Sequence, residues 1–245
     1  MKALVTGATS GIGSAIAKRL WKDGMEVIAT GRREERLSQL ISELGGSRIT
    51  AYTADLSLPQ AAESLCETTG PIDVLVNSAG GAIGLEPAQR AEVSDWMAMI
   101  RINVDAVVLL TRAYLPAMVE RGSGLVVNIG SVAGEFPYPG GNVYGAAKAF
   151  VRQFSLNLKA DLAGTGVRVT DIEPGMVGGT EFSAVRFKGD LEKAGAVYAG
   201  MTPLAAEDVA EVVSFVAGLP ARVNINTISM MPTDQGFGPF RVTRR

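Results

Sequence analysis

Short runs of β-branched and apolar residues alternate along this chain with longer segments whose apolar positions recur at steps of three and four residues. The short runs predict seven strands, at residues 2–6, 26–30, 48–53, 72–77, 124–129, 167–172 and 227–231. The longer segments predict helices at residues 12–23, 34–44, 58–68, 93–120, 144–163 and 206–217. This alternation predicts an α/β fold, a doubly wound parallel sheet of about seven strands with helices on both faces.

Two stretches, residues 130–141 and 174–203, look irregular, and both are punctuated by glycine and proline. Each follows a predicted strand, and in open parallel sheets ligands bind outside the carboxyl ends of the strands. We therefore expect both stretches at the ligand-binding edge, with residues 174–203 as a mobile substrate loop. Because no repeat or long linker divides the sequence, we expect a single domain over residues 1–245.

The first predicted strand runs through the sequence TGATSGIG directly into a helix. Glycines at these positions let the backbone turn tightly and approach a pyrophosphate, whose charge a helix N-terminus favours. The spacing differs from the usual G-x-G-x-x-G, and a simple tight connection is the alternative. At the first strand–turn–helix, however, the motif predicts a Rossmann-type dinucleotide site. Its expected cofactor-binding residues are Gly7, Thr9, Ser10, Gly11, Ile12 and Gly13.

The end of the second predicted strand carries two arginines, Arg32 and Arg33, in the sequence ATGRR. A site for NAD usually has an acidic residue there, which hydrogen-bonds the ribose 2′-hydroxyl. Two guanidinium groups would instead bind a 2′-phosphate through charge-assisted bonds, so the pattern favours NADP. The alternative is a solvated charged pair that opens the helix RREER.

Composition and charge exclude several classes of protein. The chain has 245 residues, with 23 basic against 25 acidic side chains and no histidine. The even balance of charge predicts no nucleic-acid partner. The lack of histidine excludes a Ser-His-Asp triad and a histidine-ligated metal. With Cys66 as the single cysteine, we expect no metal site, no internal disulfide and a reducing, cytoplasmic location.

The hydropathy pattern also bears on membranes. The sequence MKALVTGATSGIG reaches glycine and polar residues too early for a secretory hydrophobic region. Polar and proline positions interrupt the most apolar helical stretch, residues 104–119; they are Asp105, Thr111, Arg112 and Pro116. We therefore expect a soluble protein without a membrane partner, in which this stretch is a buried helix.

The sequence YGAAK places Tyr144 and Lys148 one helical turn apart, so that their side chains share a face. An ammonium group beside a phenol favours the phenolate, and we expect Lys148 to lower the pKa of Tyr144 toward the neutral range. Such a tyrosine can act as a general acid and base. A chance helical pair is the alternative for so short a motif, which gains its weight from its surroundings.

Several motifs follow one another in a fixed order: TGATSGIG, Asp55, NSAG at residues 77–80, Asn103, Ser131, YGAAK and the turn Pro174-Gly175. In this order they resemble the short-chain dehydrogenase/reductases over essentially the full length. A narrower likeness is to the NADP-dependent serine/3-hydroxy acid dehydrogenases, including the bacterial type that acts on L-allo-threonine, serine and malonic semialdehyde. It rests on VIATGRREERL, GGNVYGAAKAFVRQFSLNL and VRVTDIEPGMVGGTEFSAVRFKGD. The family commonly has NNAG where this chain has NSAG, a difference of little expected consequence.

The resemblance implies four catalytic residues. Tyr144 would give or take the proton, Ser131 would hold the substrate oxygen, and Lys148 would bind the nicotinamide ribose. Asn103 would maintain a water-linked proton path to Lys148. Ser131 and Asn103 also have structural alternatives, as a cap or turn after a strand and as an ordinary amide on a helix surface.

The resemblance also implies contacts with the adenosine half of the cofactor. Asp55 would contact the adenine, unless it merely caps the helix that follows. The backbone at Asn77, Ala79 and Gly80 would pass beside the adenosine ribose. Tyr144 and Lys148 would complete the cofactor site at its nicotinamide end.

The stretch after the sixth strand holds the remaining cofactor contacts that the resemblance implies. Pro174, Gly175, Val177 and Thr180 would belong to the cofactor site. Of these, Val177 and Thr180, just past the Pro174-Gly175 turn, would approach the nicotinamide carboxamide or the phosphates. The segment after Pro232 matches nothing that we can place, which leaves its role in assembly or substrate closure open.

A 3-hydroxy acid carries a carboxylate, which needs a cation or convergent hydrogen-bond donors. Arg186, in EFSAVRFKGD, is the first candidate because a guanidinium group matches the geometry of a carboxylate. Lys188 is the second choice, and Asn142 could donate a hydrogen bond to the substrate beside Ser131 and Tyr144. The alternative for Arg186 is a solvated loop arginine.

We therefore predict a dinucleotide-binding catalytic domain that transfers hydride between NADP and a short 3-hydroxy acid such as serine. One alternative is an NADPH-dependent carbonyl reductase for another small ketone, aldehyde or oxoacyl substrate. A second is a non-catalytic NADP-binding sensor. From the family resemblance we expect a homotetramer built through the helices at residues 104–120 and 144–163; the alternative is that the domain core itself buries the apolar residues of these helices.

Overall fold

Seven parallel strands form one sheet in the computed structural model, which describes residues 1–237. The strands are β1 (Lys2–Thr6), β2 (Glu26–Gly31), β3 (Ile49–Thr53), β4 (Val74–Asn77), β5 (Gly124–Ile129), β6 (Val167–Pro174) and β7 (Thr227–Met230). Their order is β3-β2-β1-β4-β5-β6-β7, so the chain starts near the middle and winds outward twice. The predicted doubly wound parallel sheet is confirmed. Residues 238–245, the end of the segment after Pro232, lie outside the described residues.

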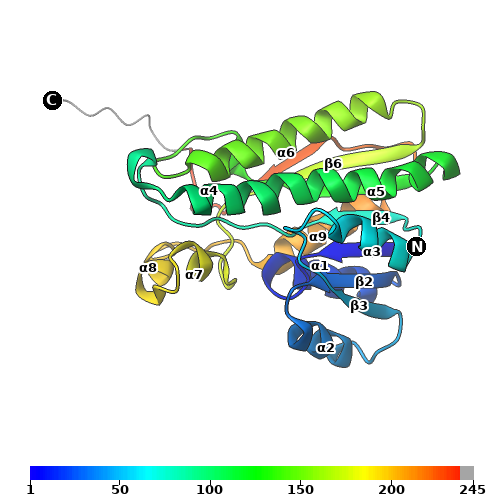
Figure 1. The fold of residues 1–245 in the computed structure, drawn as a ribbon, viewed down its shortest axis with the longest axis horizontal. Helices are drawn as coiled ribbons and strands as arrows, with labels where there is room; N and C mark the ends of the chain where they lie inside the picture. Colours follow the sequence, from blue (N-terminus) through cyan, green and yellow to red (C-terminus); the bar gives the residue numbers. More distant parts are fainter. Residues whose placement is uncertain (238–245) are drawn as a thin grey trace.

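Helices cover both faces of the sheet (Figure 1). One layer consists of α1 (Gly11–Lys22), α2 (Glu34–Glu43) and α9 (Ala206–Gly218). The other consists of α3 (Ala61–Thr69), α4 (Val93–Ile100), α5 (Ala106–Arg121) and α6 (Asn142–Asp161). Because both faces are covered, the central strands are apolar on both sides. In β5, Leu125 and Val127 belong to the core under α1 and α9, whereas Val126 belongs to the core under α5 and α6.

This winding brings distant motifs to one edge of the sheet. β1, β4, β5 and β6 are neighbours and parallel, so their carboxyl ends meet. The glycine-rich turn, NSAG, Ser131 and the Pro174 turn begin at those four ends. The sheet topology therefore brings these four motifs together, although they lie far apart in the sequence.

The helix predicted at residues 93–120 is not continuous α-helix. α4 passes into α5 through a π-helical turn, η2 (Arg101–Asp105), which contains the buried Asn103. A π turn inserts one residue into the helical repeat and often marks a functional site. Apolar periodicity does not reveal such an insertion, because the flanking turns keep their own spacing.

By length and composition, the helical stretch Val93–Arg121 could cross a membrane. Leu110, Tyr114 and Met118 instead pack into the apolar core beneath the sheet. A core helix passes the same test of length and composition as a membrane span. The absence of a membrane partner stays a prediction.

The stretch at residues 174–203 was expected to be irregular, and this is wrong in part. It contains α7 (Phe182–Arg186) and α8 (Leu191–Ala196), which lie to one side of the sheet (Figure 1). Each helix has fewer than two turns, too few for a periodic apolar pattern to stand out. The division of residues 1–245 into a single domain with this stretch as its substrate loop stays a prediction.

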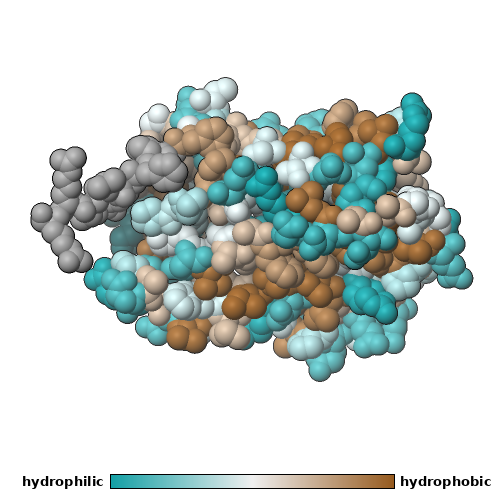
Figure 2. Space-filling model, turned by 90° about the horizontal axis from the view of Figure 1, so that it is seen from above, coloured by the Kyte–Doolittle hydropathy of each residue, from teal (hydrophilic) through white to brown (hydrophobic). Residues whose placement is uncertain are grey.

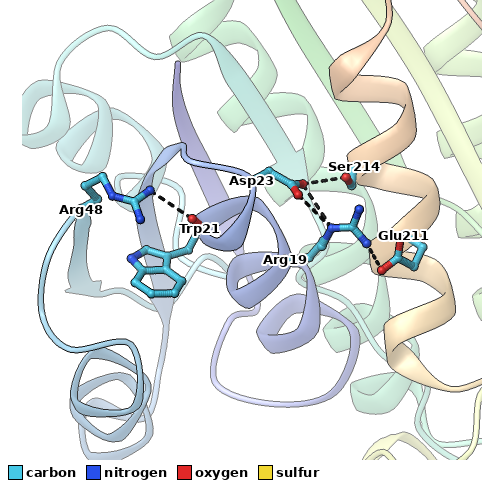
Figure 3. A network of polar contacts seen from close by, with 6 residues as sticks. All are labelled: Arg19, Trp21, Asp23, Arg48, Glu211 and Ser214. Atoms are coloured by element: carbon cyan, nitrogen blue, oxygen red, sulfur yellow. Dashed lines mark hydrogen bonds and ion pairs between the residues drawn. The ribbon is translucent and has the colours of Figure 1, made fainter.

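Polar side chains join α1 to α9 (Figure 3). Asp23, which follows α1, accepts hydrogen bonds from Arg19 Nε at 3.0 Å and from Ser214 Oγ of α9 at 2.6 Å. Arg19 also pairs with Glu211 of α9. This cluster lies on the surface above the packed apolar faces of the two helices.

We expect Asp23→Ala to lower the free energy of unfolding by up to about 1 kcal/mol, because exposed charge pairs contribute little. For a domain of this size, that corresponds to a fall of roughly 2–4 °C in Tm, measurable by thermal unfolding. Lys22→Ala, in the last turn of α1, is the matched control and should change Tm less. Equal shifts would assign the effect to the helix end rather than to the cluster.

Candidate active site

A cavity of about 320 Å³ opens at the carboxyl edge of the sheet. The glycine-rich turn lines one part of it, and residues 78–81 after β4 line another. The predicted cofactor residues that line it are Gly7, Thr9, Ser10, Gly11, Ile12, Gly13, Arg32, Arg33, Ala79, Gly80 and Thr180. The structure therefore brings most of the predicted dinucleotide residues together around one space.

The glycine-rich turn has the shape of a phosphate cradle. Gly7 has a φ of 69°, and a Cβ atom on Gly13 would lie 2.4 Å from the Gly7 carbonyl oxygen. Side chains at these positions would force the turn open. Ser10 precedes α1 without a capping bond from its side chain, so the first turn of α1 presents backbone N–H groups to the cavity. This arrangement fits a pyrophosphate.

Arg33 is held at the rim of the cavity by an acidic residue that the sequence did not single out. Its Nη2 lies 2.8 Å from Glu181 Oε2 and 3.2 Å from the Thr9 carbonyl oxygen. Arg36 Nη2 lies 4.0 Å from Glu181 Oε1. Arg32 also lines the cavity and is exposed. The guanidinium groups expected to meet a 2′-phosphate thus both line the cavity, and that of Arg33 forms a salt bridge with Glu181.

Ser131, Tyr144 and Lys148 lie together between the end of β5 and the first turns of α6. Lys148 Nζ is 5.8 Å from the centre of the Tyr144 ring and donates a hydrogen bond to the Ile129 carbonyl oxygen at 2.8 Å. Ser131 Oγ donates to the Pro174 carbonyl oxygen at 3.5 Å and lies near enough to Tyr144 to affect its pKa. Ser131 Oγ also accepts a bond from Ala133 N at 3.1 Å, so it caps the turn after β5 as well.

Burial dominates the electrostatics of this cluster. It raises the pKa of Tyr144 to about 12, although the neighbouring Ser131 hydroxyl group opposes the rise. It lowers the pKa of Lys148 to about 8, opposed by the carboxylate of Asp171. The expectation that Lys148 brings the pKa of Tyr144 toward neutrality is therefore wrong for the protein by itself. A shared apolar environment disfavours the charged form of both groups.

Asn103 is buried beside this cluster and is not a surface amide. Its Nδ2 donates to the carbonyl oxygens of Met99 at 2.9 Å and Gly81 at 2.8 Å. Its Oδ1 accepts a bond from Gly81 N at 3.2 Å. Asn103 therefore ties the π-helical turn to the segment after β4, next to the Lys148 side chain that approaches Gly80.

Arg186 of α7 faces Tyr144. Its guanidinium carbon lies 5.8 Å from the centre of the Tyr144 ring and 5.2 Å from that of Tyr138. Arg186 Nη2 donates to the Tyr138 hydroxyl at 2.8 Å, and its Nε donates to the Gly84 carbonyl oxygen at 3.3 Å. The arginine is half-buried and held in place, so a fixed positive charge stands beside the tyrosine.

Two other side chains proposed for the substrate point elsewhere. Lys188 Nζ pairs with Asp95 Oδ2 at 2.7 Å. Asn142 begins α6, and its Nδ2 donates to the Glu86 carbonyl oxygen at 3.3 Å. Lys188 is thus paired with Asp95, whereas Arg186 lies over the Tyr144 ring, which favours Arg186 over Lys188 as the cation of this site.

Of the residues predicted to contact the adenosine half, Ala79 and Gly80 line the cavity, whereas Asp55 and Asn77 bond to neighbouring residues. Asp55 accepts bonds from Ser57 N at 3.0 Å and Ser57 Oγ at 2.7 Å. These bonds and the nearby Arg32 lower the pKa of Asp55. Asp55 does not cap α3, which begins six residues later. The Asn77 side chain is buried and donates to Asn128 Oδ1 at 2.8 Å, so it supports the strand ends.

The start of the 174–203 stretch is tied to the sheet. Gly175 N donates to the Met230 carbonyl oxygen at 2.7 Å, directly after Pro174 of β6. Val177 is buried, and its carbonyl oxygen accepts a bond from the Tyr198 hydroxyl at 3.0 Å. Of the four residues predicted there, Thr180 is the one that lines the cavity.

Three site residues were missed by the sequence analysis: Tyr138, Glu181 and Phe182. Tyr138 anchors Arg186, and Glu181 occupies Arg33. Phe182 lines the cavity and packs edge-on against Tyr144, with ring centres 5.7 Å apart. Glu181 and Phe182 sit within a motif that was quoted for other reasons, Tyr138 lies in the irregular stretch at residues 130–141, and no local pattern marks any of them as a contact of the site.

Comparison with known proteins gives a consistent picture. The family model described as short chain dehydrogenase matches residues 1–190. The chain is 58% identical over 247 residues to the NADP-dependent 3-hydroxy acid dehydrogenase YdfG of Salmonella typhi, covering 100% of both chains. It is 48% identical to sulfoacetaldehyde reductase 2 of Chromohalobacter salexigens, covering 98% of both. A structure of the closed form of serine dehydrogenase complexed with NADP⁺ matches with a TM-score of 0.97 and 54% identity, covering 100% of both chains.

Proposed function

Because the chain belongs to the short-chain dehydrogenase family, we propose that it is an NADP-dependent oxidoreductase of short 3-hydroxy acids. The observation that carries the substrate class is Arg186, a held positive charge 5.8 Å from the Tyr144 ring. A substrate that places its hydroxyl group at Tyr144 and its carboxylate at Arg186 must be a small acid that carries both groups. The relatives named for NADP and 3-hydroxy acids support the same conclusion.

The cofactor site follows from the cavity. The backbone of the glycine-rich turn would hold the pyrophosphate of NADP, and Arg32 and Arg33 would meet its 2′-phosphate. Lys148 would reach the nicotinamide ribose. When bound, NADP supplies the hydride chemistry, and the protein supplies orientation and charge.

The proposed roles of the chain's own residues in oxidation concern one proton. Tyr144 as phenolate takes the proton of the substrate hydroxyl group, and in reduction it returns that proton to the carbonyl oxygen. Ser131, beside Tyr144, donates to the same oxygen as its charge changes. Lys148, fixed by the Ile129 carbonyl oxygen, places a positive charge behind the phenolate. Asn103 holds the backbone beside Lys148.

A substrate panel tests this function. The purified protein is assayed by NADPH absorbance with serine, L-allo-threonine, 3-hydroxyisobutyrate and 3-hydroxypropionate, each with NADP and with NAD. We expect turnover with NADP that exceeds turnover with NAD. Binding of NADP without turnover of any hydroxy acid or small carbonyl compound would instead support the non-catalytic sensor.

A second function is favoured by one comparison. Sulfoacetaldehyde reductase 2 is similar over almost its whole length, and sulfoacetaldehyde pairs a small carbonyl group with an anion. A sulfonate would meet Arg186 as a carboxylate does. Reduction of sulfoacetaldehyde and of malonic semialdehyde by NADPH, compared by kcat/KM, separates the two candidates.

We expect Glu181→Gln to strengthen NADP binding about twofold to fivefold. Glu181 competes with the 2′-phosphate for Arg33, and the pair is half-exposed, so its contribution is of the order of an ordinary surface salt bridge. Calorimetric titration with NADP and NAD measures the change, and NAD affinity should stay the same. Glu192→Gln on α8 is the control. Weaker NADP binding would show that Glu181 supports the closed site instead of competing for it.

We also propose a cytoplasmic homotetramer. Val93, Met97 and Val119 of the α4–α5 stretch are exposed, as is Phe150 of α6, which stacks on Phe154. Figure 2 shows hydrophobic side chains mixed with hydrophilic ones on one face of the molecule. The exposure of these apolar residues supports an assembly that would bury them between copies. Light scattering after size-exclusion chromatography measures the mass of the assembly. The free Cys66 thiol is compatible with the proposed reducing compartment.

A further inference from the structure

Two buried carboxyl groups on β6 have no part in the chemistry described so far. Asp171 is 0% exposed and Glu173 is 1% exposed. They stand two positions apart on one strand, so both side chains point to the same face of the sheet. Within the described residues, none of their four carboxylate oxygens accepts a hydrogen bond from a donor. Two carboxylates buried in this way need an explanation.

The charges that face this pair come from α6 and from the turn before it. Lys148 stands near Asp171, and Arg152, one turn further along α6, has its Nε 3.5 Å from Glu173 Oε1. Arg152 also pairs with Glu135 at 2.7 Å, at the surface. Tyr144, Lys148 and Arg152 thus follow one another at steps of four residues along the face of α6.

The neighbouring strands add no charge to the pair. In the register of the sheet, Asn128 of β5 stands opposite Asp171. Thr227 and Ser229 of β7 stand opposite Asp171 and Glu173. Among the residues that the structure describes, the balance is therefore set by two carboxyl groups, Lys148, and an arginine that Glu135 partly neutralises.

The pair also touches the catalytic loop. A Cβ atom on Gly130 would lie 2.5 Å from Asp171 Oδ1, so the carboxyl group packs against the backbone just before Ser131. Burial and the neighbouring Glu173 raise the pKa of Asp171 to about 7. Burial also raises the pKa of Glu173. Two carboxylates so close in a low dielectric relieve their repulsion when one carries a proton, which then serves as the missing donor.

We propose that Asp171 and Glu173 share one proton and act as positioning residues that control the charge of Lys148. This inference rests on the proposed function, in which a charged Lys148 stabilises the phenolate of Tyr144. A proton on Glu173 leaves the negative charge on Asp171, beside Lys148. A proton on Asp171 leaves the negative charge on Glu173, beside Arg152, and so stabilises charged Lys148 less. The pair therefore sets the pH at which Tyr144 begins to accept protons.

Two conservative variants should shift this pH in opposite directions. Glu173→Gln fixes the negative charge on Asp171, which favours charged Lys148 and moves the midpoint of serine oxidation by NADP about one pH unit lower. Asp171→Asn moves the charge away from Lys148 and raises the midpoint by a similar amount. Below the midpoint, one pH unit is about a tenfold change in kcat. A purely structural role would lower Tm in both variants and would not give opposite shifts.

The control and an independent readout complete the test. Asp161→Asn, an exposed carboxylate at the end of α6, should leave the midpoint unchanged. Infrared titration of the wild-type protein should show a protonated carboxyl band that persists up to the midpoint of serine oxidation and is missing in both variants. Shifts of the same sign, or the absence of this band, would overturn the proposal. The infrared result does not depend on turnover, so failure of the proposed function would be seen separately in the substrate panel.

Discussion

Replacing Tyr144 with phenylalanine is expected to reduce kcat by roughly 10²–10⁴-fold, the usual contribution of a general acid and base. The ring would keep its edge-on contact with Phe182, whose centre is 5.7 Å away, so the cavity wall stays in place. The hydroxyl group that exchanges the proton would be lost. Initial rates from NADPH absorbance measure the change, and NADP affinity should vary little because the glycine-rich turn and the arginines are untouched.

Tyr114→Phe is the matched control for this substitution. Tyr114 is also buried, and its hydroxyl group bonds to Thr69 Oγ1 at 2.8 Å, within the core under α5. Its removal should cost about 1 kcal/mol of folding free energy and leave kcat unchanged. If Tyr144→Phe retained most of the wild-type rate, the proton would have to move through another group, and the proposed chemistry would be wrong.

The electrostatics of the site explain why several cations are gathered around one phenol. Burial raises the pKa of Tyr144 to about 12, and Lys148 alone does not offset that rise. Arg186 lowers the pKa of Tyr144 in the protein, and a bound oxidised nicotinamide ring would add another positive charge. Oxidation needs the phenolate and should therefore accelerate as pH rises. Reduction needs the neutral phenol and should be favoured at lower pH.

The order and type of the main elements could be predicted because each has enough residues to display its period. β1 and β5 were predicted with the bounds that the structure shows, and the sheet follows from strand–helix alternation. The π-helical turn around Asn103 could not be predicted, since one inserted residue leaves the flanking periodicity intact. α7 and α8 were missed for the opposite reason, because each is too short to show a period.

Some residues of the site could be predicted from the sequence and others could not. Glycines of the first turn and the Tyr144–Lys148 pair could be predicted because their function depends on spacing along the chain. Glu181 meets Arg33 across 148 positions, and Tyr138 meets Arg186 across 48. Contacts of this kind are set by how loops fold over the sheet edge, which local sequence does not determine. The pKa of Tyr144 was misjudged for a related reason: the spacing showed the cation but not the burial.

Replacing Arg186 with alanine is expected to raise KM for 3-hydroxy acids by roughly 10–100-fold, the value of a charge-assisted hydrogen bond to a carboxylate. For an uncharged alcohol of similar size, KM should change by less than a few fold. Arg186→Lys should recover part of the affinity for acids, since it keeps the charge but loses the planar contact with Tyr138. Lys188→Ala, which breaks the pair with Asp95, is the control on the same loop. Arg186 also lowers the pKa of Tyr144, so a fall in kcat for both classes of substrate would reveal that second effect. Equal rises in KM for acids and alcohols would show that Arg186 does not recognise the carboxylate.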